Sequence, residues 1–139
     1  MQVLHPKHWA AAKGFANGIA AEGKQVFVAG QVGWNAEQVF ESDDFVAQTE
    51  QALRNIVAVL AEAGAAPEHI VRLTWYVTSK REYLDRLRDV GGAYRRVLGR
   101  HFPAMTLVQV VALVEDRAKV EIEATAVVPT GEMGSGGIG

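Results

Sequence analysis

Hydrophobic residues recur with two different spacings along this chain, and each change of spacing marks the border of an expected element. From Asp43 to Ala63 apolar side chains return every three or four residues, which predicts a helix that ends before Gly64. From Ile70 to Thr78 apolar and polar residues alternate, which predicts a strand. The apolar face of this strand is expected to carry Val71, Leu73, Trp75 and Val77.

A second helix is expected directly after this strand. Ser79 and Glu82 have the spacing of a capping box, in which the serine bonds the third helical amide and the glutamate reaches back. Helical spacing continues to Gly99, which is expected to end the helix. The predicted apolar stripe consists of Leu84, Leu87, Val90 or Gly91, Tyr94, and Val97 or Leu98.

Two hairpins are expected to flank this central part. Residues 14–21 and 25–32 form short strands around a turn at 22–24. The segment from Phe102 to Ala126 forms two more strands, joined by the polar turn at 115–117. The predicted order is ββαβαββ, an α+β fold in which both helices cover one face of a sheet.

The fourth strand implies an assembly. One of its faces carries Thr106, Val108, Val110 and Ala112, and the other carries Met105, Leu107, Gln109 and Val111. Both faces are largely apolar, but two helices cover only one of them. We therefore expect the second face to meet another copy of the chain. The alternative is a small monomer with a partly apolar open face.

The last two strands also carry a known signature. Residues 102–106, Phe-Pro-Ala-Met-Thr, and residues 120–124, Val-Glu-Ile-Glu-Ala, resemble the closing signature of the Rid family (YjgF type, also labelled L-PSP endoribonuclease). Residues 26–31, the helix from Gln48 to Gly64 and residues 70–74 fit the same family in order and spacing, so the resemblance covers residues 14–129. It implies a chorismate-mutase-like fold and a homotrimer that packs its sheets inward, with small-molecule ligands bound in clefts between subunits.

This chain departs from the family pattern in the expected cleft. The arginine that holds the substrate carboxylate in imine deaminases of the family falls on Met105. The serine before Gly-Gln falls on Ala29, and the asparagine of the second helix falls on Gly91. Phe15 stands where the family has the tyrosine of a Pro-Tyr pair. Glu121 matches the glutamate that positions the attacking water, and it is our candidate catalytic residue.

These departures change the expected chemistry. An arginine bonds both carboxylate oxygens at once, whereas Met105 offers only a soft apolar surface. Either the substrate is more apolar and lacks that carboxylate, or the site is not catalytic; a third reading, in which Arg100 reaches in, is less favoured because Arg100 is expected to face solvent. The candidate substrate-binding residues are Phe15, Ala29, Gln31, Trp34, Gly91, Phe102, Met105, Gln109 and Glu123.

Several of these residues also have plain structural interpretations. Glu121 and Glu123 lie two apart on one strand face, as an acid/base couple would, but either of them also suits hydrogen bonding at an interface. Gln109 is expected to be their hydrogen-bond partner or an interface amide. Trp34 is either a pocket wall or a loop residue packed on the core, and Met105 alone suits core packing.

Composition narrows the class of protein. The 139 residues fit one domain, which we expect at 1–129, followed by a flexible glycine-rich tail at 130–139. Absence of cysteine excludes disulfides and thiolate catalysis, and the four histidines show no metal spacing. We expect neither a metal nor a cofactor. No signal peptide or membrane span is visible, so a cytoplasmic protein is expected.

Half of the basic residues lie on or beside the second helix: Lys80, Arg81, Arg86, Arg88, Arg95, Arg96 and Arg100. Glu82, Asp85 and Asp89 are interleaved with them, which favours a solvated, ion-paired face over a nucleic-acid surface. We therefore expect no nucleic-acid partner.

Three functions compete at this point. The first is a divergent Rid-like hydrolase that acts on a small imine, enamine or related carbonyl compound, with weak or lost activity on the family's usual 2-imino acids. The second is a non-catalytic trimer that binds a metabolite or a protein. The third is RNA cleavage, as the endoribonuclease label suggests.

Overall fold

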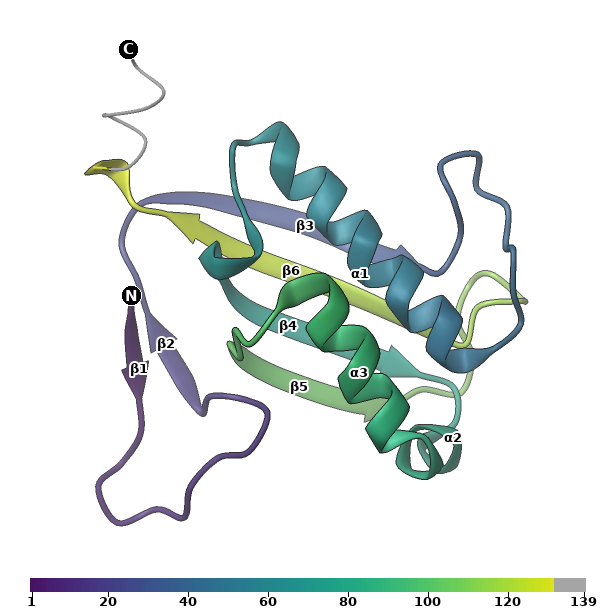
Figure 1. Cartoon of the computed structure of the whole chain (residues 1–139), viewed down its shortest axis with the longest axis horizontal. Helices are drawn as coiled ribbons and strands as arrows, with labels where there is room; N and C mark the ends of the chain where they lie inside the picture. Colours follow the sequence, from purple (N-terminus) through teal and green to yellow (C-terminus); the bar gives the residue numbers. More distant parts are fainter. Residues whose placement is uncertain (132–139) are drawn as a thin grey trace.

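The computed structural model describes residues 1–131. Its elements, in order, are β1 (Gln2–Leu4), β2 (Gly18–Ala20), β3 (Lys24–Val32), α1 (Phe45–Glu62), the 3₁₀ turn η1 (Pro67–His69), β4 (Ile70–Val77), α2 (Lys80–Asp85), α3 (Leu87–Leu98), β5 (Ala104–Gln109) and β6 (Val120–Val128). This confirms the expected α+β class (Figure 1). The flexible tail expected at 130–139 falls, from residue 132 onward, outside the described residues.

The main sheet has the strand order β3-β6-β4-β5. Strand β6 lies between β3 and β4 and is antiparallel to both. The edge strand β5 runs parallel to β4. Strand β6 takes the interior position because it is the most apolar of the four, with Val120, Ile122, Ala124, Ala126 and Val128 all buried.

Both expected hairpins are wrong. Strand β2 pairs with β1, a strand that the sequence did not reveal, while β3 pairs with β6. Strands β5 and β6 do not pair either, because β4 lies between them. The connection at 110–119 therefore passes across the end of β4 and is no tight turn. Strand pairing depends on which apolar faces meet across the sheet, and the local alternation does not reveal that.

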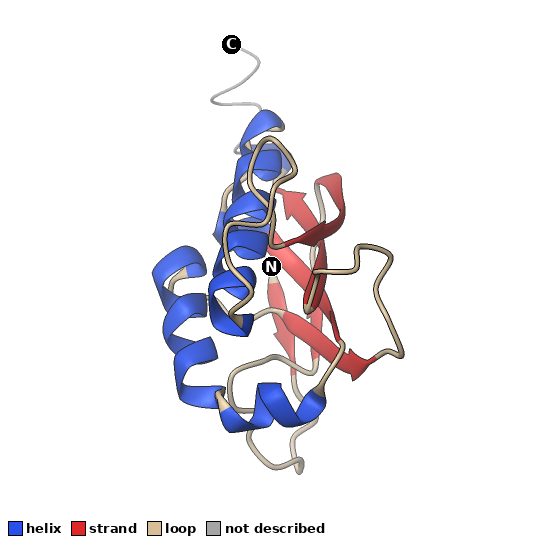
Figure 2. Cartoon of the chain, turned by 90° about the vertical axis from the view of Figure 1, so that its right-hand side faces the viewer, coloured by secondary structure: helices blue, strands red, loops and turns tan. Residues whose placement is uncertain are grey.

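The helices cover one face of the sheet, as expected (Figures 1 and 2). Helix α1 begins after Asp44, whose side chain accepts a hydrogen bond of 3.0 Å from the amide of Ala47. It buries Leu53, Ile56 and Leu60 against the sheet. Burying such side chains contributes roughly 1.5–3 kcal/mol each, so this layer supplies much of the stability.

The second helix differs from the expectation, because it breaks at Arg86 into α2 and α3. The Ser79 hydroxyl does accept a hydrogen bond of 3.1 Å from the amide of Glu82. The Glu82 carboxylate, however, binds Lys119, so the capping box is not completed. The break also turns the predicted stripe, so that Leu84 and Leu87 are exposed. The buried residues of α3 are Val90, Ala93, Tyr94 and Leu98.

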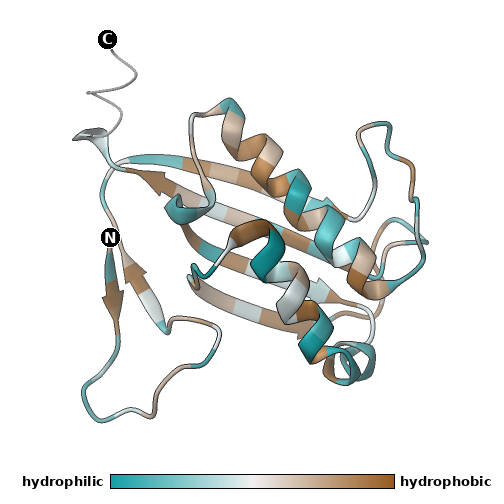
Figure 3. Cartoon of the chain, viewed as in Figure 1, coloured by the Kyte–Doolittle hydropathy of each residue, from teal (hydrophilic) through white to brown (hydrophobic). Residues whose placement is uncertain are grey.

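Ion pairs join α3 to α1 on the outside of the helical layer. Arg86 pairs with Asp44 at 3.0 Å, and Arg96 pairs with Glu50 at 2.7 Å. The expectation of an ion-paired helix face is thus confirmed for these two arginines. In Figure 3 teal, hydrophilic bands alternate with paler and brown ones along α3.

The strands differ from the expected faces in two places. A bulge at the start of β4 puts Ile70 into the core and leaves Val71 half-buried. Strand β5 ends at Gln109, so Val111 belongs to a loop and is fully exposed instead of lying on a strand face. Within β5, Met105 and Leu107 pack against the core under the helices.

The opposite face of the sheet carries no helix (Figure 2). Side chains on this open face include Thr74 and Tyr76 of β4 and Glu121 and Glu123 of β6. Phe27 of β3, opposite Thr125, lies there with 71% of its surface exposed. Within residues 1–131 no helix combines the length and the apolar character that crossing a membrane requires.

Candidate functional site

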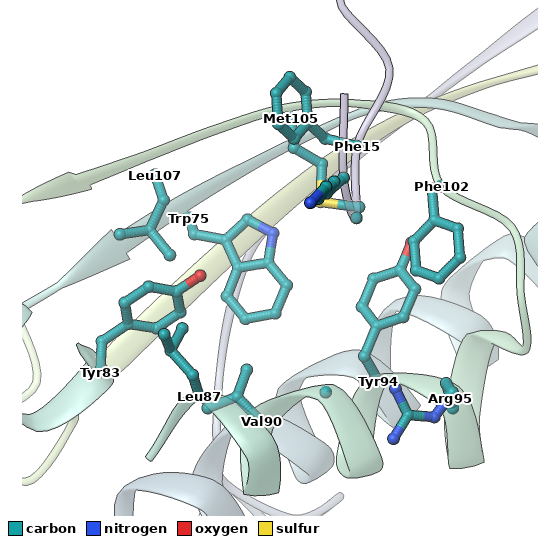
Figure 4. A pocket seen from close by; sticks show the side chains of 13 residues that line it. Phe15, Trp75, Tyr83, Leu87, Val90, Tyr94, Arg95, Phe102, Met105 and Leu107 are labelled. Carbon is teal, nitrogen blue, oxygen red and sulfur yellow. The ribbon is translucent and has the colours of Figure 1, made fainter. Parts of the chain in front are cut away.

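A pocket of about 560 Å³ opens between the helices α2 and α3 and the strands β4 and β5 (Figure 4). This volume lies within the usual range of small-molecule sites. Its walls are mainly aromatic and aliphatic, and they include Phe15, Trp75, Tyr94, Phe102, Met105 and Leu107. Four of the predicted site residues, Phe15, Gly91, Phe102 and Met105, therefore lie around one cavity.

Stacked rings hold one wall of this pocket in place. Tyr94 stacks on Phe102 with ring centroids 5.4 Å apart, and on Trp75 at 6.4 Å. The Tyr94 hydroxyl donates a hydrogen bond of 2.5 Å to the carbonyl of His101. Burial raises the pKa of Tyr94 far above its usual value, so the hydroxyl stays protonated and serves as a donor.

Few polar groups reach the pocket. The indole Nε1 of Trp75 is buried and has no hydrogen-bond partner among the described residues. Burial also raises the pKa of Tyr83, whose ring stands beside the indole in Figure 4. Two cations, Lys13 and Arg95, lie among the lining residues, which include no carboxylate.

Gly91 leaves room for one of these cations. A Cβ atom at Gly91 would lie 3.3 Å from Nη1 of Arg95, one helical turn further along α3. The guanidinium thus occupies space that a side chain at position 91 would need. Arg95 forms no hydrogen bond or ion pair with another described residue.

A second, smaller hollow of about 300 Å³ lies on the open face of the sheet. Glu121, Glu123, Tyr76 and Gly30 line it. The Tyr76 hydroxyl donates a hydrogen bond of 2.5 Å to the carboxylate of Glu123, and this bond is the main reason that the pKa of Tyr76 is raised. Glu123 is therefore engaged within its own protomer.

Glu121 is in a different state. Its carboxylate has no hydrogen-bond partner among the described residues and lies directly over Gly30. A side chain at position 30 would collide with Oε2 of Glu121, so only glycine permits this placement. The carboxylate is free to accept a proton or a hydrogen bond from a molecule in the hollow.

The two hollows lie on opposite faces of the sheet. Met105 pairs with Leu73 on the helical side, whereas Glu121 pairs with Tyr76 on the open side. One protomer therefore does not bring Met105 and Glu121 into a common cavity. A cleft that contains both requires residues from two copies of the chain.

The remaining predicted site residues lie elsewhere. Trp34 packs on Phe40 with ring centroids 5.7 Å apart, so it contacts another residue of its own loop and lies outside the pocket. The side chain of Gln31 donates a hydrogen bond to the carbonyl of Ala29. Ala29 is exposed. The prediction that Gln109 is a hydrogen-bond partner of the two glutamates is wrong. The side-chain oxygen of Gln109 instead accepts a hydrogen bond of 2.7 Å from the amide of Lys80.

Comparisons with known proteins identify the family of the chain. The model of the family described as endoribonuclease L-PSP matches residues 6–128. The chain belongs to the endoribonuclease L-PSP family. The family signature at 102–106 thus begins at the edge of the apolar pocket, and the signature at 120–124 crosses to the open face.

Relatives in this family carry different names. The protein DfrA of Myxococcus xanthus is 38% identical over 112 residues, which cover 76% of this chain and 77% of that protein. The 2-iminobutanoate/2-iminopropanoate deaminase of Salmonella typhimurium is 32% identical over 108 residues, which cover 76% of this chain and 80% of that protein. The structure of the Rid-family protein YyfB from Yersinia pestis, of unknown function, matches with a TM-score of 0.79 at 32% identity and covers 91% of this chain and 98% of that one.

Sequence reasoning missed Arg95 and Trp75 as residues that line the pocket. Arg95 follows Gly91 by four residues, a spacing that puts both on one helix face, so the signal was present. Arg100 was weighed instead, because it is closer to Met105 along the chain. The unpartnered indole of Trp75 had no signal, because it depends on packing between α3, β4 and β5.

Proposed function

We propose that this protein is a hydrolase of the family that acts on a small imine or enamine with a more apolar body than the family's usual substrates. Glu121 is the catalytic residue, and Met105 lines the apolar part of the site. Activity on short 2-imino acids is weak, because no cation stands at position 105.

The free carboxylate of Glu121 carries this proposal. A general base must have an unshared acceptor within reach of the water that it activates. Glu121 has no partner among the described residues, whereas the neighbouring Glu123 is bound to Tyr76. Both oxygens of the Glu121 carboxylate are thus available to a water, whereas Glu123 has one of its two oxygens bound to Tyr76.

The reaction follows from these groups. Glu121 takes a proton from water while the oxygen adds to the carbon of the C=N bond. Glu121 gives this proton to the nitrogen, which forms a carbinolamine. Glu121 then takes the hydroxyl proton of the carbinolamine and passes it to the amino nitrogen as the C–N bond breaks, so that ammonia and a carbonyl compound leave. Met105, Phe15 and Phe102 exclude bulk water from the apolar part of the substrate.

We further propose that the working site forms between copies in a homotrimer. Glu121 would face its neighbour from the open side of one sheet, and the apolar pocket of the neighbour would supply the other wall. The separation of Met105 and Glu121 on opposite faces of one protomer supports an arrangement that uses two copies.

The test follows ammonia release from imines made in situ. An amino-acid oxidase supplies imines with a carboxylate, and an amine oxidase supplies arylalkyl imines without one. We expect faster release from the apolar imines, and loss of about two to four orders of magnitude in Glu121→Gln, the range of a missing general base. Glu62→Gln, an exposed change at the end of α1, is the matched control. No release above the spontaneous rate on either class would refute the proposed hydrolase.

A further inference from the structure

The loop between β5 and β6, residues 110–119, holds two apolar side chains in solvent. The amide of Val110 and the carbonyl of Lys119 form backbone hydrogen bonds of 2.9 and 3.1 Å at the end of β4, so both ends of the loop are fixed there. Between these ends, Val111 and Val114 have relative exposures of 105% and 94% in the protomer. Ordering a loop costs conformational entropy, and exposed valines offset none of it by burial. Other contacts of the loop must therefore hold it in this shape.

One of the two valines faces the hollow that contains Glu121. Leu113 and Val114 line this hollow, whereas Val111 does not. The larger apolar side chains of its wall come from the loop, and the carboxylates and the Tyr76 hydroxyl come from β6 and β4. The position of the loop therefore sets how much apolar surface a molecule beside Glu121 meets.

The side chain of Arg117 ties this loop to the loop at 33–44. Its Nε and Nη2 atoms lie 3.0 and 2.9 Å from Oδ1 of Asp43, and its Nη1 donates a hydrogen bond of 3.2 Å to the carbonyl of Phe40. The guanidinium carbon also lies 5.6 Å from the centroid of the Phe40 ring. One side chain thus combines an ion pair, a hydrogen bond to the backbone and a cation–π contact.

A buried amide joins the same two loops beside this contact. Gln48 is 1% exposed, and its Nε2 donates hydrogen bonds of 3.0 Å to the carbonyls of Ser42 and Arg117. Its Oε1 accepts a hydrogen bond of 2.8 Å from the amide of Lys119. These buried bonds fix the base of the loop. The side chain of Arg117 is 51% exposed, so its removal acts on the outer part of the loop and leaves the core closed.

We propose that Arg117 positions the loop at 110–119 as the apolar wall that the substrate body contacts beside Glu121. Arg117 touches neither the base nor the reacting C=N bond, and it acts through Leu113 and Val114. Without Arg117 the loop leaves this position, and binding has to order it again. The wall contacts the body of the substrate equally in the ground state and the transition state, so its loss raises KM and leaves kcat little changed. As a statement about the substrate, this inference rests on the proposed function.

The first test compares the kinetics of two arginine variants. Arg117→Ala should raise the KM for arylalkyl imines about five- to tenfold and keep kcat within about twofold of the parent. Arg117→Lys, which keeps a charge opposite Asp43 but lacks the planar fork, should fall between the two. Arg96→Ala is the matched control, because Arg96 has a similar side-chain exposure of 56% and pairs with Glu50 on the helical side. It should leave KM unchanged. Equal effects of Arg117→Ala and Arg96→Ala, or a lower kcat at unchanged KM, would overturn the inference.

Two valine variants separate the wall from the rest of the loop. Both side chains are exposed on the same loop, but only that of Val114 lines the hollow. Val114→Ser should raise KM, whereas Val111→Ser should not. Val114→Ser should also have a smaller effect in Arg117→Ala than in the parent, because the wall is already displaced there. Full additivity of the two changes would show that Arg117 does not act through this wall.

A measurement without turnover distinguishes this inference from the hydrolase. Phenylacetone has an apolar body and the carbonyl group of a product. Calorimetry should show it binding Arg117→Ala about five- to tenfold more weakly than the parent or Arg96→Ala. Amide hydrogen exchange of residues 111–116 should become faster in Arg117→Ala alone. This pattern with no hydrolysis of any imine would refute the hydrolase and leave the role of Arg117 intact. Hydrolysis whose KM does not depend on Arg117, or no binding of phenylacetone to the parent at millimolar concentration, would refute the role of Arg117.

Discussion

At the scale of single residues, the site depends on what two glycines leave empty. Gly30 leaves space for the carboxylate of Glu121, and Gly91 leaves space for the guanidinium of Arg95. In each case a small residue on one element lets a long charged side chain lie flat against the backbone. The functional groups are thus set by absent side chains as much as by present ones.

Gly30→Ala is the direct test of this idea. The added methyl group would force the Glu121 carboxylate away from its position, while the end of that side chain is flexible enough to let the protein fold. We expect hydrolysis to fall by about a hundredfold, the usual order for a displaced catalytic group, with thermal unfolding little changed. Gly92→Ala makes the same chemical change away from both hollows and should keep full activity. Unchanged hydrolysis in Gly30→Ala would show that the position of Glu121 over Gly30 is not required.

Met105→Arg tests the other half of the site. It introduces a cation at the position where the sequence resemblance places the family's arginine, beside the pocket that Arg95 also lines. We expect ammonia release from 2-iminopropanoate to rise by about tenfold or more, because a short carboxylate gains a bidentate partner. Met105→Leu, which keeps an apolar side chain, should leave that rate unchanged. If both variants behave alike, charge at position 105 does not select the substrate.

At the scale of elements, helix termini and helix composition decide how firmly α1 and α3 cover the sheet. Asp44 both caps α1 and binds Arg86 between α2 and α3, so one side chain links three helices. The two adjacent glycines of α3, Gly91 and Gly92, weaken that helix by themselves. Gly91 lines the apolar pocket, whereas Gly92 does not.

Gly92→Ala should therefore stabilise the protein. Alanine in a helix interior is favoured over glycine by about 0.5–1 kcal/mol. The new Cβ would lie 3.3 Å from Nη1 of Arg96, but Arg96 binds Glu50 through Nε and Nη2, so Nη1 is free to shift. Urea unfolding at a fixed protein concentration should show this gain. A loss of stability would mean that α3 is too tightly packed at this position.

Asp44 gives a pH-dependent prediction. The hydrogen bond from Arg86, and then that from the amide of Ala47, lower the pKa of Asp44 below its usual value. A lowered folded-state pKa contributes stability above the unfolded value near about 4 and loses it as pH falls through the folded value. Asp44→Ala should cost about 1 kcal/mol at pH 7, whereas Asp44→Asn, which keeps a capping oxygen, should cost less. Urea unfolding of the two variants and the parent at pH 7 and pH 3 should show the Asp44→Asn deficit shrinking at the lower pH.

The sequence predicted the elements far better than their partners. The helix at 45–62 and the strands at 24–32 and 70–77 follow from periodicity, because burial of one face imposes it. The two expected hairpins failed, because β5 and β6 alternate in the same way whether they pair with each other or with β4. Met105, Phe15, Gly91 and Phe102 were found together only through the family signature. The donor on Trp75 had no local signal at all.

At the scale of the whole molecule, the main feature is the open face of the sheet, which no helix covers. Phe27 and Val108 are exposed there, and Glu121 points from it. The helices leave this face uncovered in a protomer of 15.0 kDa. A trimer that buries it would also bring Glu121 of one copy to another copy.

Sedimentation should therefore give three times the protomer mass. Val108→Asp puts a charge on the open face of β5 and should dissociate the assembly, because an unpaired buried charge is costly. Val59→Asp is the matched control, since Val59 has a similar exposure of 40% but lies on α1, on the helical side. A monomer in the unchanged protein, or dissociation by the control alone, would contradict assembly through this face.

Mixing two inactive variants tests whether one site uses two copies. Glu121→Gln removes the base, and Gly91→Phe fills the apolar pocket beside Met105. We refold trimers from an equal mixture of the two variants. If each site takes Glu121 from one copy and the pocket from the next, half of the copies have an intact Glu121 and half have an open pocket, so roughly a quarter of the sites should have both. Hydrolysis should return to about that fraction of the parent rate, whereas each variant refolded alone stays inactive. If the base and the pocket belonged to the same copy, every mixed site would lack one of them and no activity would return. The two hollows on opposite faces of the sheet would then serve different purposes, because no single protomer joins them.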